Sequence, residues 1–387
     1  MTICMAVTHT VEDGTTFVSL SDTQITVEGE SQNPLPISIN VTGVTSPAYN
    51  GAAYSQVDLA LKTILINPQM VLLMSGSVAA AARLKRQIKM EFGRHPERNN
   101  QIGAWLQSNF KNLGKAIDFN SISFMIYFIH AGQTGSISHR AAARYDRDFR
   151  VEVIGSGSTL SSALFETGSS PWNVIPGSRG IPSDIDRVMG RIIEGCARAF
   201  LNEVTGEGLL HKACNGITEV ALTTSENCFR KINGIQNLFV AVEMEGSEVT
   251  MNLRAFNSLR YKVADGIDEE YADLVLGRKT PFGQSGAQRR NVYELGSVLT
   301  EHPLKSDGPM FDHAFEIVNV CGMIKIDDTV MRPFWFADPR LSVGVEYGQD
   351  GFDMTSEVSR SIQEMILGDQ RFFRANAGHA MARSVGS

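Results

Sequence analysis

The stretch that decides the fold is the amino terminus, Met1-Thr2-Ile3-Cys4-Met5-Ala6-Val7, together with Phe17-Val18-Ser19-Leu20-Ser21-Asp22-Thr23-Gln24-Ile25-Thr26. These two apolar runs flank a polar connection, residues 8–16, that contains Asp13-Gly14. An Asp-Gly pair between two such runs is a strong hairpin signal, because the turn needs residues that adopt positive φ. The chain is therefore predicted to open on a β-hairpin, with Thr2 at the tip of the first strand.

Thr2 is a candidate nucleophile. It follows Met1 and is small, so removal of Met1 is expected. Removal leaves one residue that carries both a hydroxyl group and a free α-amine. An α-amine has an ordinary pKa of about 7.7–8.0, so it can act as a base near neutral pH without a histidine. The alternative is an ordinary threonine that begins a strand.

Two later segments complete a pattern with this opening. Residues 71–80 read Val-Leu-Leu-Met-Ser-Gly-Ser-Val-Ala-Ala, an apolar run followed by a Ser-Gly-Ser turn and small helix formers. Residues 153–158 read Val-Ile-Gly-Ser-Gly-Ser. Together with the two runs of the hairpin, and in this order, these segments resemble proteasome β-type subunits and the bacterial HslV-like proteases. Both are N-terminal-nucleophile (Ntn) hydrolases, and the resemblance covers residues 2–224.

The resemblance implies a four-layer αββα sandwich of the proteasome-like type. The residues alone indicate an α+β fold with mostly antiparallel pairs. We expect the Ntn-hydrolase domain at residues 1–263, followed at residues 264–387 by a C-terminal extension. That extension is expected to hold a polar excursion at 265–307, strands, a short helix and a frayed tail. Helices are expected at residues 79–92, 100–117, 159–167, 184–204 and 356–367.

The resemblance also assigns roles to five residues. Thr2 corresponds to the nucleophile and base, and Asp22 to the acid that orients a lysine beside it. Gly76 corresponds to the glycine whose backbone N–H donates to the developing oxyanion. Ser156 corresponds to the serine that hydrogen-bonds near the amine, and Lys62 is the candidate for the lysine. Ordinary turn and helix-capping roles are the alternatives for Asp22, Gly76 and Ser156.

Two positions depart from the family pattern. Counting back from Ser75-Gly76 places the family's lysine nearer to Asp58 than to Lys62. The alternation of residues 57–62 puts Asp58 and Lys62 on one face, so a register change would bring Lys62 to the site. A cation there would lower the pKa of the amine and favour its free base. In the second departure, Asn215 stands where the family has an aspartate, and an amide contributes no charge.

Composition excludes several other classes of protein. The chain has 387 residues, of which 43% are hydrophobic and 20% charged, as in an ordinary soluble globule. A net charge of −7 without a basic block argues against nucleic-acid binding. Five scattered cysteines without a C-x-x-C pair suggest neither a zinc site nor a disulfide framework. The amino terminus lacks a signal-peptide pattern and no apolar run approaches ~18 residues, so a cytoplasmic protein is expected.

No cofactor or metal is expected, because the histidines do not pair at metal-ligand spacing and residues 155–158 are not followed by the lysine of a phosphate-binding loop.

The leading hypothesis is an N-terminal threonine hydrolase that cleaves amide bonds, chiefly peptide bonds, in a proteasome-like assembly. The alternatives are a non-catalytic proteasome-like subunit for assembly or binding, and an amidase of small acylated metabolites. The insertion at 27–55 would close a pocket for the latter. Expected partners are a peptide or small amide and further copies of the chain, packed through the helices at 79–92 and 100–117. The sequence names no ATPase partner and predicts contact with neither nucleic acid nor membrane.

Overall fold

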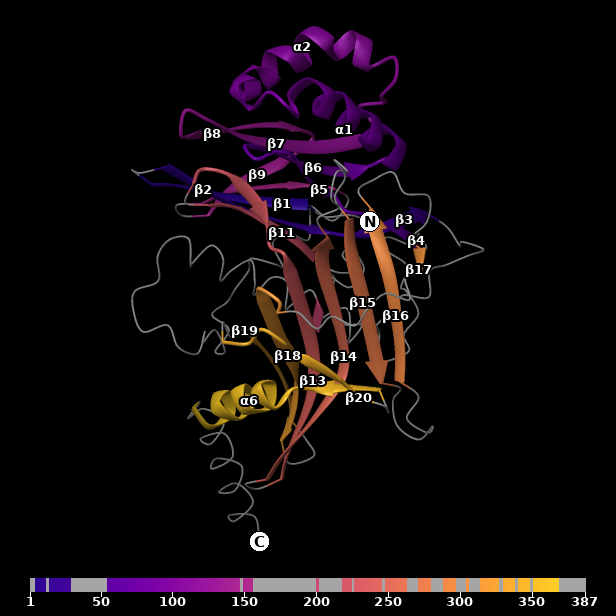
Figure 1. Ribbon diagram of the computed structural model, residues 1–387, viewed down its shortest axis with the longest axis vertical. Helices are drawn as coiled ribbons and strands as arrows, with labels where there is room; N and C mark the ends of the chain where they lie inside the picture. The colour runs from indigo at the N-terminus through magenta and orange to yellow at the C-terminus, as the bar shows by residue number, and fades with distance from the viewer. Residues whose placement is uncertain are drawn as a thin grey trace, which may run out of the picture.

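The computed structural model describes residues 4–11, 14–28, 54–146, 149–155, 200–201, 218–224, 226–245, 248–262, 271–279, 288–296, 304–305, 314–326, 330–337, 340–348 and 351–368. Most of these residues lie in β-strands, which form three larger sheets and two small hairpins (Figure 1). The helices in the described part are few, and they cover two of the larger sheets.

The first sheet has six strands and contains the predicted hairpin. In spatial order its strands are β12 (Phe229–Lys231), β11 (Thr218–Thr223), β2 (Gly14–Asp22), β1 (Cys4–Val11), β10 (Phe149–Ile154) and β9 (Ala142–Asp146). β1 and β2 pair antiparallel from Cys4 opposite Ser21 to Val11 opposite Gly14. The hairpin prediction is confirmed, and β1 lies in the middle of the sheet.

The second sheet has four strands, and two helices cover one of its faces. Its strands are β5 (Thr63–Asn67), β6 (Met70–Gly76), β7 (Ile122–His130) and β8 (Gln133–His139). The covering elements are α1 (Val78–Phe92), the 3₁₀ helix η1 (Pro96–Gln101) and α2 (Ile102–Leu113). α1 begins where the Ser77 side chain accepts a hydrogen bond from the Ala80 backbone N–H, the usual way to satisfy a free helix-terminal donor. The predicted helices at 79–92 and 100–117 are confirmed with shifted ends.

Alternation along the strands of the second sheet builds a core on each of its faces. Leu72 and Met74 point towards α1 and α2. Val71 and Leu73 point the other way, where they join Phe17 and other buried residues of the first sheet. The described elements thus stack as six-stranded sheet, four-stranded sheet and helices, as the upper part of Figure 1 shows.

The third sheet is the largest and comes from the C-terminal half of the chain. In spatial order its strands are β17 (Leu304–Lys305), β16 (Gln288–Gly296), β15 (Tyr271–Lys279), β14 (Glu248–Lys262), β13 (Gly234–Glu245), β18 (Ile317–Ile326) and β19 (Val330–Ala337). Two hairpins complete the strand inventory, β3 (Gln24–Glu28) with β4 (Tyr54–Leu59) and β20 (Val345–Gly348) with β21 (Gly351–Met354). One face of the large sheet packs against α6 (Ser356–Gly368), which confirms the predicted helix at 356–367. The other face buries Leu259 and Cys321 with Leu61, the residue before Lys62.

The predicted four-layer αββα sandwich is wrong. The described chain is mainly β-sheet, and the helices of its described part are α1, η1, α2, α6 and two helical residues at 200–201. The residues after 263 were expected to form an elaboration, whereas β15 and β18 flank β14 and β13 in one seven-stranded sheet. β15, β16 and β17 also fall in the segment 265–307 that was expected to be a polar excursion.

Other predictions concern residues that the structure does not describe. The helix at 159–167 lies outside the described residues, as do the tail and, apart from residues 200–201, the helix at 184–204. Of the insertion at 27–55, only the ends that belong to β3 and β4 are described. The division of the chain at residue 263 stays a prediction, although the third sheet takes hydrogen-bonded strands from both sides of that position.

Candidate functional site

A buried ion pair between Asp22 and Lys62 forms the centre of the candidate site. The Nζ of Lys62 donates a hydrogen bond to Oδ1 of Asp22 over 3.1 Å, and the two side chains are 7% and 2% exposed. Asp22 is the last residue of β2, and Lys62 directly precedes β5. Removing two charges from water is costly, so each charge at this depth needs the other as a partner.

Backbone hydrogen bonds hold Lys62 beside Asp22. The Ala60 N–H donates to the carbonyl of Thr23 over 2.8 Å, which ties this segment to the residue after Asp22. The Lys62 carbonyl accepts from the Met74 N–H over 3.1 Å, which ties it to β6. The segment therefore bridges the first and second sheets, and this placement holds Lys62 beside Asp22.

Glu219 lies behind the ion pair and is fully buried. It is on β11, which pairs with β2 so that Glu219 faces Ser21. One carboxylate oxygen, Oε2, accepts from the backbone N–H groups of Lys62 and Thr63 over 2.5 and 3.1 Å and from the Ser21 hydroxyl over 3.2 Å. The other oxygen, Oε1, accepts from Lys231 Nζ over 3.2 Å and from the Tyr261 hydroxyl over 3.0 Å. The sequence analysis assigned Glu219 no role.

Cys4, the first residue of β1, lies within the electrostatic field of these charges. Its Sγ donates to the Met74 carbonyl over 3.2 Å. Burial raises the pKa of the Cys4 thiol; nearby Lys62 opposes this rise, while Asp22 and Glu219 add to it. Thr2 itself lies outside the described residues, two positions before Cys4 in the sequence.

Gly76 ends β6 in a conformation that favours glycine. Its φ is +104°, and a Cβ atom built there would lie 2.2 Å from the carbonyl oxygen of Ser121. The next residue, Ser77, donates its N–H to that same carbonyl over 2.8 Å and caps α1. Gly76 lies two residues after Met74 on β6, and the Met74 carbonyl accepts the hydrogen bond from Cys4 at the start of β1. Gly76 is therefore only two residues along the strand from a contact with the start of β1.

Ser156 and Asn215 lie outside the described residues, so their predicted roles stay predictions. The described chain stops at Gly155, which has a φ of +103° and follows Ile154. Ile154 is paired with Cys4 across β10 and β1. The structure thus brings together Asp22 and Lys62 directly, and it brings the residue before Ser156 close to the start of β1.

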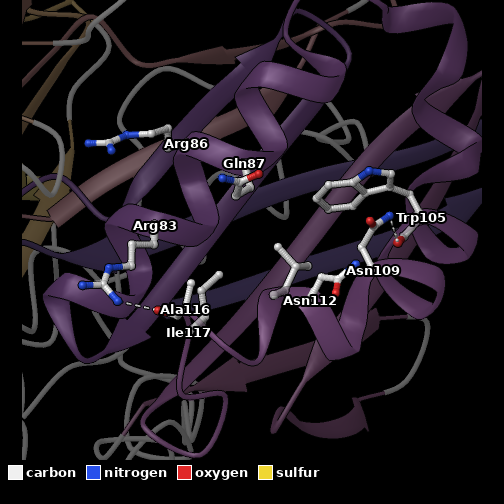
Figure 2. Close-up of a pocket in the computed structure, with 9 residues that line it drawn as sticks. Arg83, Arg86, Gln87, Trp105, Asn109, Asn112, Ala116 and Ile117 are labelled. Carbon is white, nitrogen blue, oxygen red and sulfur yellow. Dashed lines mark hydrogen bonds between the residues drawn. The ribbon is translucent and has the colours of Figure 1, made fainter.

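A surface pocket of about 220 Å³ lies elsewhere, on α1, α2 and the residues that follow α2. Figure 2 shows the Arg83 guanidinium turned to the Ala116 carbonyl, to which it donates over 2.6 Å. Asn109 on the other wall donates its side-chain N–H to the Trp105 carbonyl over 3.0 Å. Of the predicted site residues that the structure describes, Asp22, Lys62 and Gly76 do not line this pocket, which lies on the helix-covered side of the second sheet, opposite the core that contains Cys4.

Among the residues that the structure describes, no group of three or more His, Cys, Asp or Glu side chains is arranged to hold a metal ion. None of the described helices combines the length and the apolar character needed to cross a membrane. The charged groups of the described site are two buried carboxylates, Asp22 and Glu219, and two buried ammonium groups, Lys62 and Lys231.

Glu219, Lys231 and Tyr261 are the contributors that sequence reasoning missed. A lone glutamate in the apolar run of residues 217–222 is the one signal that points to them, because a carboxylate inside a buried strand needs partners. The partners themselves come from β12 and β14, and nothing in the spacing of the sequence identifies them.

Searches of protein-family models and of curated proteins find no match for this chain.

Proposed function

We propose that this chain is an N-terminal threonine hydrolase that cleaves amide bonds, with Thr2 as nucleophile after removal of Met1. The observation that carries the proposal is the buried ion pair of Asp22 and Lys62 beside the start of β1. The resemblance to proteasome β-type subunits and HslV-like proteases implies an aspartate and a lysine beside the terminal threonine, and Lys62 is the candidate lysine although counting back from Ser75-Gly76 favours Asp58.

The distance along the chain is compatible with this role. Cys4 is paired with Ser21, the neighbour of Asp22. Two residues of fully extended chain span at most about 7 Å, so Thr2 is covalently restricted to the surroundings of Cys4. Burial of the cation next to this point supports an electrostatic role, since a lysine whose task is solubility would lie at the surface.

The proposed reaction uses the two functional groups of the terminal residue. The α-amine of Thr2 accepts the hydroxyl proton as the oxygen attacks the carbonyl carbon of the amide. The resulting tetrahedral intermediate collapses when the ammonium returns the proton to the leaving amine, and the threonine oxygen is left as an acyl ester. A water molecule, deprotonated by the same amine, then attacks the ester and releases the acid.

Lys62 sets the protonation state of that amine. A cation nearby disfavours the ammonium form, so it lowers the amine's pKa and raises the fraction of free base at neutral pH. Asp22 compensates the buried lysine and fixes its direction through the 3.1 Å hydrogen bond. The oxyanion is assigned to the backbone N–H of Gly76, because the family resemblance places the oxyanion-binding glycine at this position.

The test is intact-mass and amino-terminal peptide analysis of natively expressed protein, followed by incubation with a threonine-directed β-lactone or epoxyketone. Processed protein is expected to take up one label at Thr2, and labelling is expected to disappear in Thr2→Ala and to persist in Thr2→Ser. Fluorogenic peptide amides and short acyl amides, assayed in parallel, identify the substrate class. Retention of Met1 on every chain, with no label, would overturn the proposal in favour of a non-catalytic subunit.

A further inference from the structure

Glu219 is a buried charge that the proposed reaction does not use. The whole residue is 0% exposed, and its two carboxylate oxygens accept hydrogen bonds from five donors. Hydrogen bonds to an ionised, buried acceptor are among the strongest in proteins. A carboxylate with so many donors holds its neighbours in one arrangement, so the identity of those neighbours indicates what it does.

The Oε2 side of Glu219 holds the backbone of the catalytic lysine. It accepts from the N–H groups of Lys62 and Thr63, so two successive peptide units are fixed to one atom. The same atom accepts from the Ser21 hydroxyl, which also lies 2.6 Å from the Thr63 hydroxyl. Ser21 is next to Asp22, so Glu219 contacts the residues on both sides of the ion pair, through the Ser21 side chain and through the Lys62 and Thr63 backbone.

The Oε1 side connects the site to the large third sheet. Tyr261, on β14, donates its hydroxyl to Oε1, and Lys231, on β12, donates its ammonium. The Lys231 Nζ also lies 4.6 Å from the centroid of the Tyr261 ring, a cation–π contact. Lys231 is itself buried, with a side chain that is 6% exposed.

The charges of this cluster balance. Asp22 and Glu219 are negative, and Lys62 and Lys231 are positive. Among the described residues, the thiol of Cys4, from β1, and the phenol of Tyr261, from β14, also face the cluster. In a buried cluster with zero net charge, removal of one charge is felt by every neighbouring titratable group.

We propose that Glu219 is the positioning residue for Lys62, and that Tyr261 makes the third sheet part of the catalytic apparatus while Lys231, from β12 of the first sheet, helps to hold Glu219. The inference rests on the proposed threonine hydrolase function. Glu219 touches neither the substrate nor the reacting atoms. It holds the Lys62 backbone so that the Lys62 ammonium lies against Asp22. Lys231 and Tyr261 hold Glu219 in place through hydrogen bonds to Oε1.

The experiment measures the rate of β-lactone labelling as a function of pH in the full chain. Glu219→Gln removes a negative charge, and the excess positive charge is expected to lower the midpoint of the pH profile. The labelling rate at pH 7 is nevertheless expected to fall at least tenfold, because the Lys62 backbone loses the carboxylate that holds it in place. Lys231→Met removes a positive charge and is expected to move the midpoint to higher pH. Combining the two changes restores the balance, so the midpoint is expected to return while the rate stays low. Tyr261→Phe is expected to slow labelling several-fold without moving the midpoint.

Glu316→Gln is the matched control. Glu316 also accepts a backbone N–H, from Asn233, and pairs with Arg230 beside the third sheet, but its side chain is 38% exposed and outside the cluster. It is expected to label as wild type does. If Glu219→Gln labels at the wild-type rate and with the wild-type pH midpoint, the inference is wrong and the proposed function stands. If the wild-type chain takes up no label, both the proposed function and the inference are wrong. If Glu219→Gln fails to fold, Lys231→Met provides the test. A midpoint of its labelling profile that moves to higher pH supports the inference, and an unchanged midpoint overturns it.

Discussion

The hydroxyl of Tyr127 donates a hydrogen bond to Oε2 of Glu152 over 2.5 Å, and this bond joins the second sheet to the first from within their shared core. Tyr127 lies on β7 and Glu152 on β10, and both residues are almost completely buried. Glu152 also accepts from Ser138 and pairs with Arg150. The two sheets that carry the candidate site are therefore connected by a buried polar network as well as by apolar packing.

Tyr127→Phe is expected to lower the free energy of unfolding by about 1.5–3 kcal/mol, because it removes a hydrogen bond to a charged acceptor. Urea denaturation measures the change. Glu152→Gln, alone and combined with Tyr127→Phe, completes a double-mutant cycle. We expect the two changes to be non-additive by about 1 kcal/mol or more. Additive effects would show that the bond contributes little to stability.

The same variant should change how stability depends on alkaline pH. Burial, and then the Glu152 carboxylate, raise the pKa of Tyr127 well above its ordinary value. The folded state therefore keeps this proton when the unfolded chain has lost it, and the stabilisation is complete below about pH 10 and declines as the pH rises further. Tyr127→Phe is expected to have a shallower loss of stability above pH 10 than wild type. Parallel profiles would contradict the argument.

The opening hairpin could be predicted from sequence because its signals are local. Asp13-Gly14 and two flanking apolar runs predict that β1 pairs with β2, although the strands extend to Val11 and from Gly14, into the connection expected at residues 8–16. Lys62 was ambiguous because counting back from Ser75-Gly76 favoured the position of Asp58. Bonds from Ala60 to Thr23 and from Met74 to Lys62, made by residues distant in sequence, settle where Lys62 lies.

Strands β15, β16 and β17 of the third sheet were missed for a different reason. Glycines and a proline in the segment 265–307 indicated a linker. One of these glycines, Gly277, instead lies inside β15 against Phe256 of β14, where a Cβ would be 1.9 Å from the ring. Glycine in a strand can mark a close approach of this kind, and only the packed structure distinguishes that from a turn. Glu219 was missed likewise, since its donors come from four separate segments of the chain.

Thiol reactivity should separate the described cysteines. Burial raises the pKa of both Cys4 and Cys321, so neither is expected to form a thiolate at pH 8 in the folded protein. Cys228 is partly exposed. Brief alkylation with iodoacetamide followed by peptide mapping is expected to modify Cys228 at least tenfold faster than the other two. In guanidinium chloride all three should react at similar rates, and fast native modification of Cys4 would contradict its burial.

Gly76→Ala tests the constraint at the end of β6. The new methyl group would clash with the Ser121 carbonyl, which no rotation of a side chain can relieve. Gly132→Ala is the matched control, since Gly132 also has a positive φ, +76°, but has nothing within 4 Å of a built Cβ. The control is expected to cost about 1–2 kcal/mol from backbone strain. Gly76→Ala is expected to cost a further 1–3 kcal/mol or so from the clash. Equal losses in thermal unfolding would contradict the close contact.

Lys62→Met and Asp22→Asn separate the structural role of the ion pair from its proposed role in catalysis. Each single change leaves one buried charge without its compensating partner, so each is expected to lower the free energy of unfolding by about 3–5 kcal/mol. The double variant leaves no isolated charge and is expected to recover most of that loss. Stability that falls additively would show that the two residues are not a pair.

Labelling should respond differently from stability in these variants. Without the Lys62 cation the pKa of the Thr2 amine rises, so the residual labelling of Lys62→Met is expected to shift to higher pH. The double variant is expected to be stable yet slow, because recovery of the fold does not restore the cation. The measurement is the β-lactone labelling rate between pH 6 and 10, beside urea denaturation of the same samples. A double variant that labels as fast as wild type at pH 7 would remove Lys62 from the reaction, and Thr2 would then need another means of keeping its amine unprotonated.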